Sequence, residues 1–396
     1  MTDVSRSDPP PDRELDLVLF GATGFTGRLT AEYLARHASE GLRWGLAGRN
    51  PAKLESVREH LVTVDESLGD LPLLTADVDD DVSLKDVANR ARVVITTVGP
   101  YLRYGEPLVA ACAEAGTDYV DLTGESEFVD RTYVAHHATA QQTGARLVHA
   151  CGFDSIPHDL GAYFTVQQLP DDVPITVRGV VRAGATISGG TFHSALNGLS
   201  RVRQARAAFA ARRAIEPRPQ GRRSRAVRGK PHHDSVLGRW LVPLPTIDPT
   251  IVARSGAALP VYGPDFRYSH YAGFTSLPYV AGTAAGAGVM MVAAQVPPLR
   301  KALMSRVKAG DGPSEPRREK SWFTVDFVGQ AGGTTLHTRV SGGDPYTESA
   351  TMLAESGLCL ALDDNPTTSG QVTTAVAMGE HLTRRLLDAG IRFDVR

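Results

Sequence analysis

The sequence has few cysteines and almost no net charge. Its 396 residues include three cysteines, Cys112, Cys151 and Cys359, whose spacing fits neither a disulfide framework nor a zinc site and agrees with a reducing cytosol. The 42 basic residues are balanced by 44 acidic ones, so the net charge of −2 gives no overall attraction to nucleic acid. A small disulfide-rich secreted protein and a strongly basic nucleic-acid-binding protein are therefore excluded.

Metal-ligand spacing and a targeting segment are also missing. The twelve histidines are scattered or adjacent, as in His136-His137 and His232-His233, and adjacent side chains point apart on a helix or strand. We therefore expect no metal site. The first residues are polar and proline-rich, without the apolar run of a signal peptide, so residues 1–14 are predicted to be a disordered tail of a cytoplasmic protein.

The chain is too long for one core and divides into regions of different pattern. Residues 15–168 alternate short apolar runs with helix-like segments, which predicts an α/β Rossmann domain with a doubly wound parallel sheet. Residues 169–345 are less regular and predict a second, α+β domain for substrate or dimer contact. Residues 346–396 are predicted to be helices that return to the Rossmann domain and pack on it.

A glycine-rich turn directly follows the apolar run 17–20. Residues 21–27 read Gly-Ala-Thr-Gly-Phe-Thr-Gly and open a helix-like segment. Such a turn places backbone N–H groups and the positive end of a helix dipole against a pyrophosphate, with no Cβ in between. We predict a dinucleotide site here in preference to a plain tight turn. Its residues are Gly21, Thr23, Gly24, Phe25, Thr26 and Gly27.

Further candidates follow other predicted strands, at the sheet edge where ligands bind. Arg49 stands where NAD-specific proteins usually place a carboxylate, so it favours NADP over NAD by pairing with the 2′-phosphate; the alternative is a solvated arginine. Asp77 either accepts a hydrogen bond from the adenine amino group or caps the next helix. Gly99 and Pro100 either border the nicotinamide ribose or simply form a turn.

A strongly basic stretch occupies residues 201–233. Residues 201–230 hold eleven Arg or Lys and one acidic residue, Glu216. The part up to residue 215 reads as a helix and the rest as a mobile loop. Nucleic-acid binding is not expected, because residues 211–233 contain no aromatic side chain and no reader motif. An acyl carrier protein or an anionic membrane surface fits better, and a solvated loop without a role is the alternative.

An uncharged stretch occupies residues 271–299. Its length allows a membrane span, but Leu and Ile are scarce and Pro278, Pro297 and Pro298 bracket the apolar part. Three interpretations stay open. They are a span, a shallow membrane-contacting segment, and a buried helix of small residues that lines an apolar substrate or a homodimer contact.

Motifs at both ends of the chain carry a family resemblance. They are Gly-Ala-Thr-Gly-Phe-Thr-Gly-Arg at 21–28, Ala-Gly-Arg-Asn at 47–50, Thr-Val-Gly-Pro-Tyr at 97–101, Tyr-Val-Asp-Leu-Thr-Gly-Glu at 119–125, Ala-Cys-Gly-Phe-Asp-Ser-Ile-Pro at 150–157 and Gly-Asp-Pro-Tyr at 343–346. The sequence resembles the saccharopine dehydrogenase-like oxidoreductases, and more narrowly their actinobacterial branch, which includes trans-acting enoyl reductases of polyketide-type lipid synthesis. The resemblance covers the middle poorly, and residues 371–375 depart from a Leu-Thr-Pro run often found in the family.

The resemblance implies an NADPH-dependent enoyl reductase for a lipid-like acyl thioester, presented by an acyl carrier protein, in lipid or glycolipid biosynthesis. Hydride would add at Cβ of the substrate and an acid would protonate Cα, for which Tyr101, Tyr104 and His158 are our catalytic candidates. A saccharopine-type amino-acid dehydrogenase is one alternative. A nucleotide-binding protein at lipid surfaces, without turnover, is the other. The expected location is the cytoplasm, at the inner face of the plasma membrane if residues 271–299 contact lipid.

Overall fold

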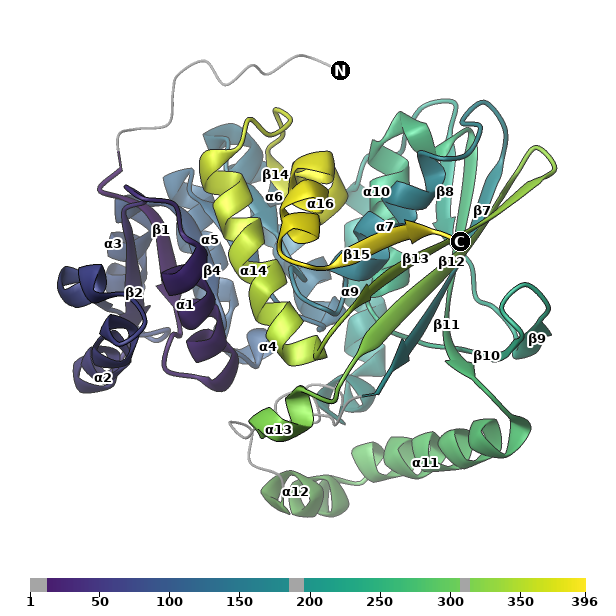
Figure 1. Ribbon diagram of the computed structural model, residues 1–396, viewed down its shortest axis with the longest axis horizontal. Helices are drawn as coiled ribbons and strands as arrows, with labels where there is room; N and C mark the ends of the chain where they lie inside the picture. The colour runs from purple at the N-terminus through teal and green to yellow at the C-terminus, as the bar shows by residue number, and fades with distance from the viewer. Residues whose placement is uncertain (1–12, 185–195, 307–313) are drawn as a thin grey trace. The chain divides into compact units, whose positions relative to one another are not determined.

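The structure is a computed structural model that describes residues 13–184, 196–306 and 314–396 (Figure 1). The chain forms two compact units. The described residues of Met1–Thr123, Phe128–Phe153 and Tyr346–Ala389 make up the first, and those of Gly124–Glu127, Asp154–Pro345 and Gly390–Arg396 make up the second. The boundary expected at 168/169 thus lies at 153/154, because the helix after residue 155 packs on the sheet of the second unit.

The first unit contains a seven-stranded parallel sheet in the order β14-β6-β5-β4-β1-β2-β3. Leu17, Val18 and Leu19 of its first strand are completely buried, as expected for a strand covered on both faces. The predicted Rossmann architecture is confirmed. The strands are β1 (Leu15–Phe20), β2 (Trp44–Gly48), β3 (Leu73–Thr75), β4 (Ala91–Thr96), β5 (Asp118–Asp121), β6 (Arg146–Val148) and β14 (Gly370–Val372).

The C-terminal helices return to this unit, as predicted. A Cβ at Gly357 would lie 2.5 Å from the Ile95 side chain, so the helix that carries Gly357 lies directly on β4. The Tyr33 hydroxyl donates to Glu355 Oε1 at 2.7 Å, which joins this helix to the first one of the chain. The helices are α1 (Phe25–His37), α2 (Pro51–Val62), α3 (Asp81–Arg90), α4 (Tyr101–Tyr104), α5 (Glu106–Ala115), α6 (Ser126–Thr143), α14 (Pro345–Leu362), α15 (Thr374–Ala377) and α16 (Gly379–Asp388).

The sequence reading missed one strand of this sheet. β14 adds to β6, with Gln371 opposite Leu147. It is three residues long, and its partner is far away in the sequence, so no local pattern marks it. The helices expected after residue 346 include two short ones, α15 and α16. They are separated at the start of α16, where Gly379 has a φ of +46°, outside the range of a right-handed helix.

The second unit contains a mixed sheet in the order β15-β13-β12-β7-β11-β10-β9, with β8 paired to β11. A Cβ at Gly161 would lie 2.4 Å from the Phe327 ring, so glycine lets the first helix of this unit lie closely on the sheet. The strands are β7 (Ile175–Ala183), β8 (Arg223–Ala226), β9 (His232–Asp234), β10 (Arg239–Pro243), β11 (Asp265–Phe274), β12 (Phe323–Ala331), β13 (Thr334–Gly342) and β15 (Arg392–Val395). The helices are α7 (Ile156–Val166), α9 (Val202–Ile215), α10 (Asp248–Ala258), α11 (Leu277–Gln295), α12 (Pro297–Arg306) and α13 (Glu315–Arg318), with short 3₁₀ turns at Glu66–Asp70 in the first unit and Pro260–Tyr262 in the second.

The basic stretch is more ordered than predicted. Its first part forms α9, but the segment expected to be a mobile loop contains β8, which pairs in parallel with β11. Arg212 is buried and forms an ion pair with Glu216, which also pairs with Arg254 at 2.7 Å. Arg222 donates to three backbone carbonyl oxygens. Arg212 and Arg222 therefore help to hold the second unit together.

The uncharged stretch forms the end of β11, the whole of α11 and the start of α12. The described side chains of α11 are mostly exposed. Tyr279, Val289, Met291 and Val292 are between 53% and 69% exposed. None of the helices that the structure describes has the length and hydropathy needed to cross a membrane. Among the described residues α11 is therefore not buried within its own chain, whereas its burial in a homodimer contact stays a prediction.

The predicted N-terminal tail mostly falls outside the described residues. Its last two positions are described and held in place. Arg13 donates to the Ala115 carbonyl oxygen at 2.5 Å, and Glu14 forms an ion pair with Arg90 at 2.8 Å. Both residues are therefore attached to the first unit ahead of β1.

Candidate functional site

The glycine turn after β1 leaves the start of α1 open. Gly21 has a φ of +96°, a left-handed conformation that favours glycine. Gly24 is the N-cap of α1, no side chain caps the helix, and its first turn holds no acidic residue. A Cβ at Gly24 would meet only the Gly21 carbonyl oxygen, at 3.6 Å, among the described atoms within 4 Å. This end of α1 therefore offers space and a positive dipole end to an anion.

Gly27 and Thr97 fix the turn to the neighbouring strand. A Cβ at Gly27 would lie 2.2 Å from the Gly21 carbonyl oxygen and 2.8 Å from Thr97 Oγ1, so only glycine fits. The Thr97 hydroxyl donates to the Gly21 carbonyl oxygen at 3.0 Å. The order of strands reverses between β1 and β4, and open α/β sheets bind ligands at such a point.

The remaining predicted residues of the turn surround this opening. Thr23 is half-buried. Phe25 and Thr26 belong to the first turn of α1, where the Phe25 ring meets the Tyr346 ring edge-on, with the centroids 6.1 Å apart. The Thr26 carbonyl oxygen accepts the Thr30 hydroxyl at 2.9 Å. The first turn is thus held in place by contacts that leave Gly24 uncovered.

Arg49 follows β2, and Asp77 lies just beyond β3. Arg49 is exposed and forms no hydrogen bond or ion pair with any other described residue. The Asp77 carboxylate accepts the Asp79 N–H at 3.1 Å. The N-cap of α3 is Asp80, which accepts the Val82 N–H, so the capping alternative for Asp77 is wrong.

The segment after β4 contains both tyrosine candidates. The Gly99-Pro100 peptide bond is cis and leads directly into α4. Tyr101 is buried, and its hydroxyl donates to the Thr96 carbonyl oxygen at 3.1 Å. Tyr104 is half-buried, and its hydroxyl forms no hydrogen bond within the described residues. Tyr101 therefore anchors α4 to β4, whereas the Tyr104 hydroxyl is available.

Sequence reasoning missed a buried network around Asp121. One oxygen of this carboxylate accepts the N–H groups of Thr123 at 3.0 Å and Ala150 at 2.9 Å. The other accepts the Tyr119 hydroxyl at 2.9 Å and lies 2.7 Å from His149 Nδ1. This network joins the ends of β5 and β6. The signal that could have revealed it is a carboxylate at the last position of a buried strand.

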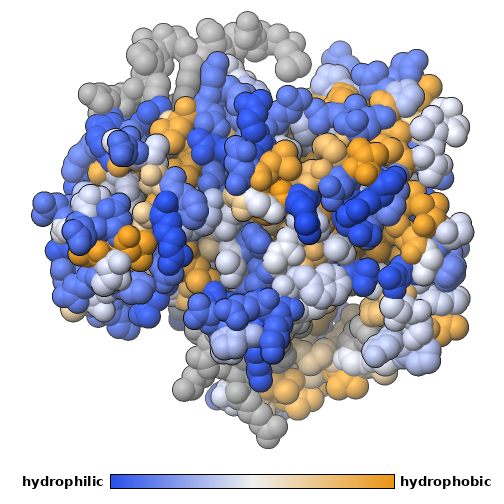
Figure 2. Space-filling view, in the orientation of Figure 1, coloured by the Kyte–Doolittle hydropathy of each residue, from blue (hydrophilic) through white to orange (hydrophobic). Residues whose placement is uncertain are grey.

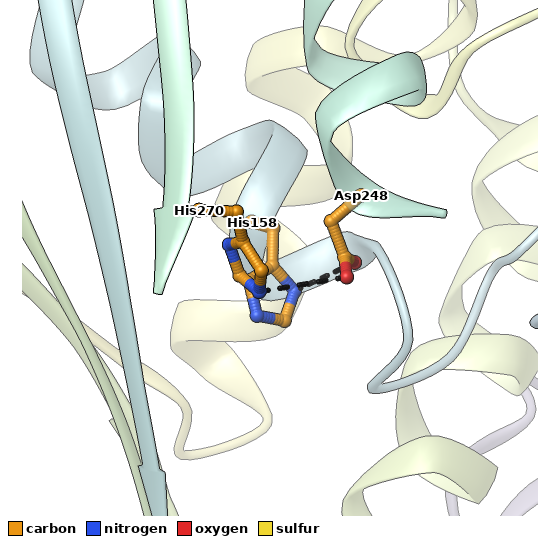
Figure 3. A group of neighbouring side chains, drawn as sticks. All are labelled: His158, Asp248 and His270. Atoms are coloured by element: carbon orange, nitrogen blue, oxygen red, sulfur yellow. Dashed lines mark ion pairs between the residues drawn. The ribbon is translucent and has the colours of Figure 1, made fainter. Parts of the chain in front are cut away.

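Three polar side chains converge inside the second unit (Figure 3). His158 comes from α7, Asp248 from the start of α10 and His270 from β11, and each is at most 4% exposed. His158 Nδ1 is 3.2 Å from Asp248 Oδ1, and His270 Nε2 is 3.6 Å from Asp248 Oδ2. The two imidazole rings meet edge to face with centroids 4.8 Å apart. His158 was predicted as a catalytic candidate, but its partners were not.

Burial sets the protonation of this cluster. It lowers the pKa of His158 to about 3. It also lowers the pKa of His270 to about 4, although the charge of Asp248 opposes the shift. Burial raises the pKa of Asp248, against the opposing charge of His270. Near pH 7 both imidazoles are therefore neutral, and His158 is a poor proton donor.

Asp154 and Ser155 lie beside the cluster. Ser155 occupies the N-cap position of α7, but its hydroxyl donates to Asp248 Oδ1 at 3.2 Å and does not cap the helix. Asp154 is exposed, yet the protein atoms packed around its carboxyl raise its pKa to about 7, and the charge of Asp248 adds to the shift.

Comparison with known proteins agrees with this geometry. Residues 17–148 match the saccharopine dehydrogenase NADP-binding domain family. A protein of Mycobacterium tuberculosis that is provisionally named a trans-acting enoyl reductase is 40% identical to this chain. The match covers 96% of this chain and 97% of the relative. The trans-acting enoyl reductase of Mycobacterium ulcerans is 37% identical over 96% of this chain and 97% of its own length. Among solved structures, saccharopine dehydrogenase (L-Glu forming) of Saccharomyces cerevisiae, 13% identical, shares the fold with a TM-score of 0.55 over 96% of this chain and 100% of that chain.

Proposed function

Because the chain belongs to the trans-acting enoyl reductase family and is an NADP-binding oxidoreductase, we propose that it reduces an α,β-unsaturated acyl thioester with NADPH. The observation that carries the proposal is the open glycine turn at Gly24, on a chain that matches enoyl reductases over almost its full length. The acyl substrate would come from a partner synthase of lipid or glycolipid biosynthesis.

Residues at the carboxyl ends of successive strands hold the cofactor in this proposal. The first turn of α1 at Gly24 binds the pyrophosphate, and Arg49 pairs with the 2′-phosphate. Asp77 keeps acceptor capacity for the adenine amino group, and Gly99 and Pro100 border the nicotinamide ribose. When bound, NADPH supplies the hydride that the substrate receives at Cβ.

Tyr104 is the donor that the geometry favours. Reduction at Cβ leaves negative charge on the thioester oxygen and requires a proton at Cα, so a hydroxyl that can donate is needed. The Tyr104 hydroxyl has no hydrogen-bond partner within the described residues, whereas the Tyr101 hydroxyl already donates to the Thr96 carbonyl oxygen. We assign proton donation to Tyr104 and the positioning of α4 to Tyr101. His158 is disfavoured because its imidazole is neutral.

Exposed arginines on α9 support delivery of the acyl group by an acidic carrier protein. Arg203, Arg206 and Arg213 are exposed and spaced so that they share one face of the helix. Long-range attraction of an acidic partner by such a face would raise the rate of encounter. Arg212, in contrast, is buried in its pair with Glu216 and belongs to the fold.

The apolar helix α11 supports contact with the inner face of an anionic membrane, by a protein of the cytoplasm. Figure 2 shows apolar side chains at the lower edge of the view, where Figure 1 places α11. Val289 and Val292 are 69% and 63% exposed, and α12 follows with Arg300 and Lys301. An exposed apolar face next to cations suits an interface of anionic lipid. A homodimer through the same face is the competing use.

Steady-state NADPH oxidation tests the enzymatic proposal. Turnover with a carrier-bound enoyl thioester, and none with saccharopine and NADP⁺, would support it. The reverse preference would establish the amino-acid dehydrogenase alternative. NADPH binding without turnover of either substrate would establish a nucleotide-binding protein that is not an enzyme.

Sedimentation with vesicles tests the membrane contact. The parent should sediment with phosphatidylglycerol vesicles and less with phosphatidylcholine, and the double variant Val289→Asp, Val292→Asp should lose binding at least about tenfold. Val82→Asp is the control, because Val82 is 78% exposed in the other unit. A parent that stays in solution as a dimer, and becomes a monomer in the double variant, would assign α11 to dimer contact.

A further inference from the structure

The cluster of His158, Asp248 and His270 has the composition of a metal site. One ligand atom from each residue can be chosen so that all three lie within 4.8 Å of one another. Two imidazole nitrogens and one carboxylate oxygen form a common ligand set of zinc sites, in which a water or substrate oxygen takes the fourth position. No local pattern predicts this site, because the three residues lie far apart along the chain in α7, α10 and β11.

The spacing of the ligand atoms suits a single ion. Zinc bonds of about 2.0–2.2 Å in tetrahedral geometry place neighbouring ligand atoms roughly 3.3–3.6 Å apart. His158 Nδ1 lies 3.2 Å from Asp248 Oδ1 and His270 Nε2 lies 3.6 Å from Asp248 Oδ2, so each nitrogen has this spacing to one of the two carboxylate oxygens. The longer distance exceeds that of a hydrogen bond, so direct hydrogen bonding does not account for the arrangement of His270 Nε2 and the carboxylate.

Outer partners orient two of the three ligands. The Tyr268 hydroxyl lies 3.1 Å from His270 Nδ1, which leaves Nε2 directed at Asp248. The Ser155 hydroxyl donates to Asp248 Oδ1 at 3.2 Å. Metal-binding histidines are typically oriented in this way through the second ring nitrogen. Figure 3 shows that both rings present a nitrogen to the carboxylate.

The buried charge also favours a cation. Only a neutral imidazole has a free lone pair on a ring nitrogen, and this is the form that binds a metal ion. An ionised carboxylate that is 3% exposed is costly unless a cation or a proton neutralises it. A divalent ion between the three side chains would remove that cost.

We propose that His158, Asp248 and His270 form a binding site for one divalent transition-metal ion, with Zn²⁺ as the best match. The ion ties α7, α10 and β11 together inside the second unit and keeps a coordination position for a fourth oxygen ligand. Asp154 lies close enough for its charge to interact with that of Asp248.

The test uses tag-free protein stripped with a chelator and then titrated with Zn²⁺ or Co²⁺. We expect one ion per chain by elemental analysis, a higher melting temperature with Zn²⁺, and the absorption of tetrahedral Co²⁺. His158→Gln and His270→Gln should each lower metal affinity at least about 100-fold, and Tyr268→Phe about 10–100-fold. His233→Gln is the matched control, because His233 is exposed in the same unit.

The binding of NADPH to the first unit should not change in any of these variants and reports that the chain is folded. The proposal is overturned if the stripped parent binds less than about one tenth of an ion per chain and gains no thermal stability from Zn²⁺. It is also overturned if His233→Gln loses as much metal as the cluster variants do. If the variants fail to fold, the Co²⁺ spectrum of the parent alone decides.

Discussion

Asp121 Oδ1 accepts the backbone N–H of Ala150 at 2.9 Å, and Ala150 has a φ of +61°. This left-handed conformation is unfavourable for a residue with a Cβ, so the carboxylate holds the chain in a shape that alanine would not adopt alone. The same side chain binds the ends of β5 and β6 together. Two of the family motifs therefore meet in one buried hydrogen-bond network.

Asp121→Asn should destabilise the protein. The amide would present a donor where the carboxylate now accepts from Tyr119, and its neutral oxygen would accept the two backbone N–H groups more weakly than the charged carboxylate does. We expect a loss of about 2–3 kcal/mol in the free energy of unfolding, measured with urea. Asp79→Asn, at an exposed position of the same unit, should change it by less than about 0.5 kcal/mol. Equal effects of the two would mean that the network contributes little.

Gly24→Ala should weaken NADPH binding without unfolding the protein. The new Cβ meets only one described atom, at 3.6 Å, so the fold tolerates it, but it occupies the space assigned to the pyrophosphate. We expect a dissociation constant about 10–100-fold higher by fluorescence titration, with stability changed by less than about 1 kcal/mol. Gly69→Ala, where nothing lies within 4 Å of the Cβ, is the control. An unchanged affinity in Gly24→Ala would place the pyrophosphate elsewhere.

Arg49→Asp should discriminate between the two nicotinamide cofactors. A charge-assisted pair with the 2′-phosphate is worth about 1.5–3 kcal/mol, so NADPH affinity should fall at least about tenfold while NADH affinity falls much less. Isothermal titration with both cofactors measures the difference. Arg36→Gln at the far end of α1 removes a positive charge from the same unit and should leave both affinities within about twofold. Parallel losses for the two cofactors in Arg49→Asp would remove the phosphate role.

Tyr104→Phe should lower kcat about 100-fold on the enoyl thioester and leave NADPH affinity unchanged, because it removes the assigned proton donor. Tyr101→Phe should act differently. It removes the bond to the Thr96 carbonyl oxygen, so we expect a loss of about 1 kcal/mol in stability and a smaller effect on kcat. The solvent isotope effect and the pH profile of kcat separate the two roles. A larger loss of kcat in Tyr101→Phe than in Tyr104→Phe would mean that Tyr101 is the proton donor and that Tyr104 has the positioning role.

The carboxyl of Asp154 should make stability depend on pH. Its pKa in the folded chain is about 7, above the ordinary 3.8, so it stabilises the fold fully below about pH 4 and loses this contribution as the pH rises through 7. Asp154→Asn does not ionise, so its stability relative to the parent should increase between about pH 4 and pH 7 and level off above pH 7. Urea unfolding with a chelator present measures this difference. A difference that stays flat over this range would contradict the raised pKa of Asp154.

Much of the first unit could be predicted because its signals are local. The run that ends at Phe20 and the glycine turn after it are contiguous in sequence, and both lie where the pattern placed them. Features that depend on distant partners were missed. β8 reads as an arginine-rich loop until β11 is there to pair with it, and β14 needs β6.

The side-chain clusters follow the same rule. Asp121 gave no local sign that it accepts the Ala150 N–H, and His158 gave none that it would meet His270. The site residues were predicted from their positions at the ends of strands. Such a position locates a residue relative to the sheet but does not identify its hydrogen-bond partners. Asp80, and not Asp77, caps α3, which only the exact start of the helix decides.

The chain passes between the two units after residues 123, 127, 153, 345 and 389. No single cut can therefore release either unit as one continuous polypeptide. A fragment that stops before α14 lacks the helix that packs on β4 in the first unit. A fragment that stops at Ala389 lacks β15, the edge strand of the second sheet. Synthesis must reach the last residues before either half can complete its fold, and shortened versions made for expression should be chosen with that dependence in mind.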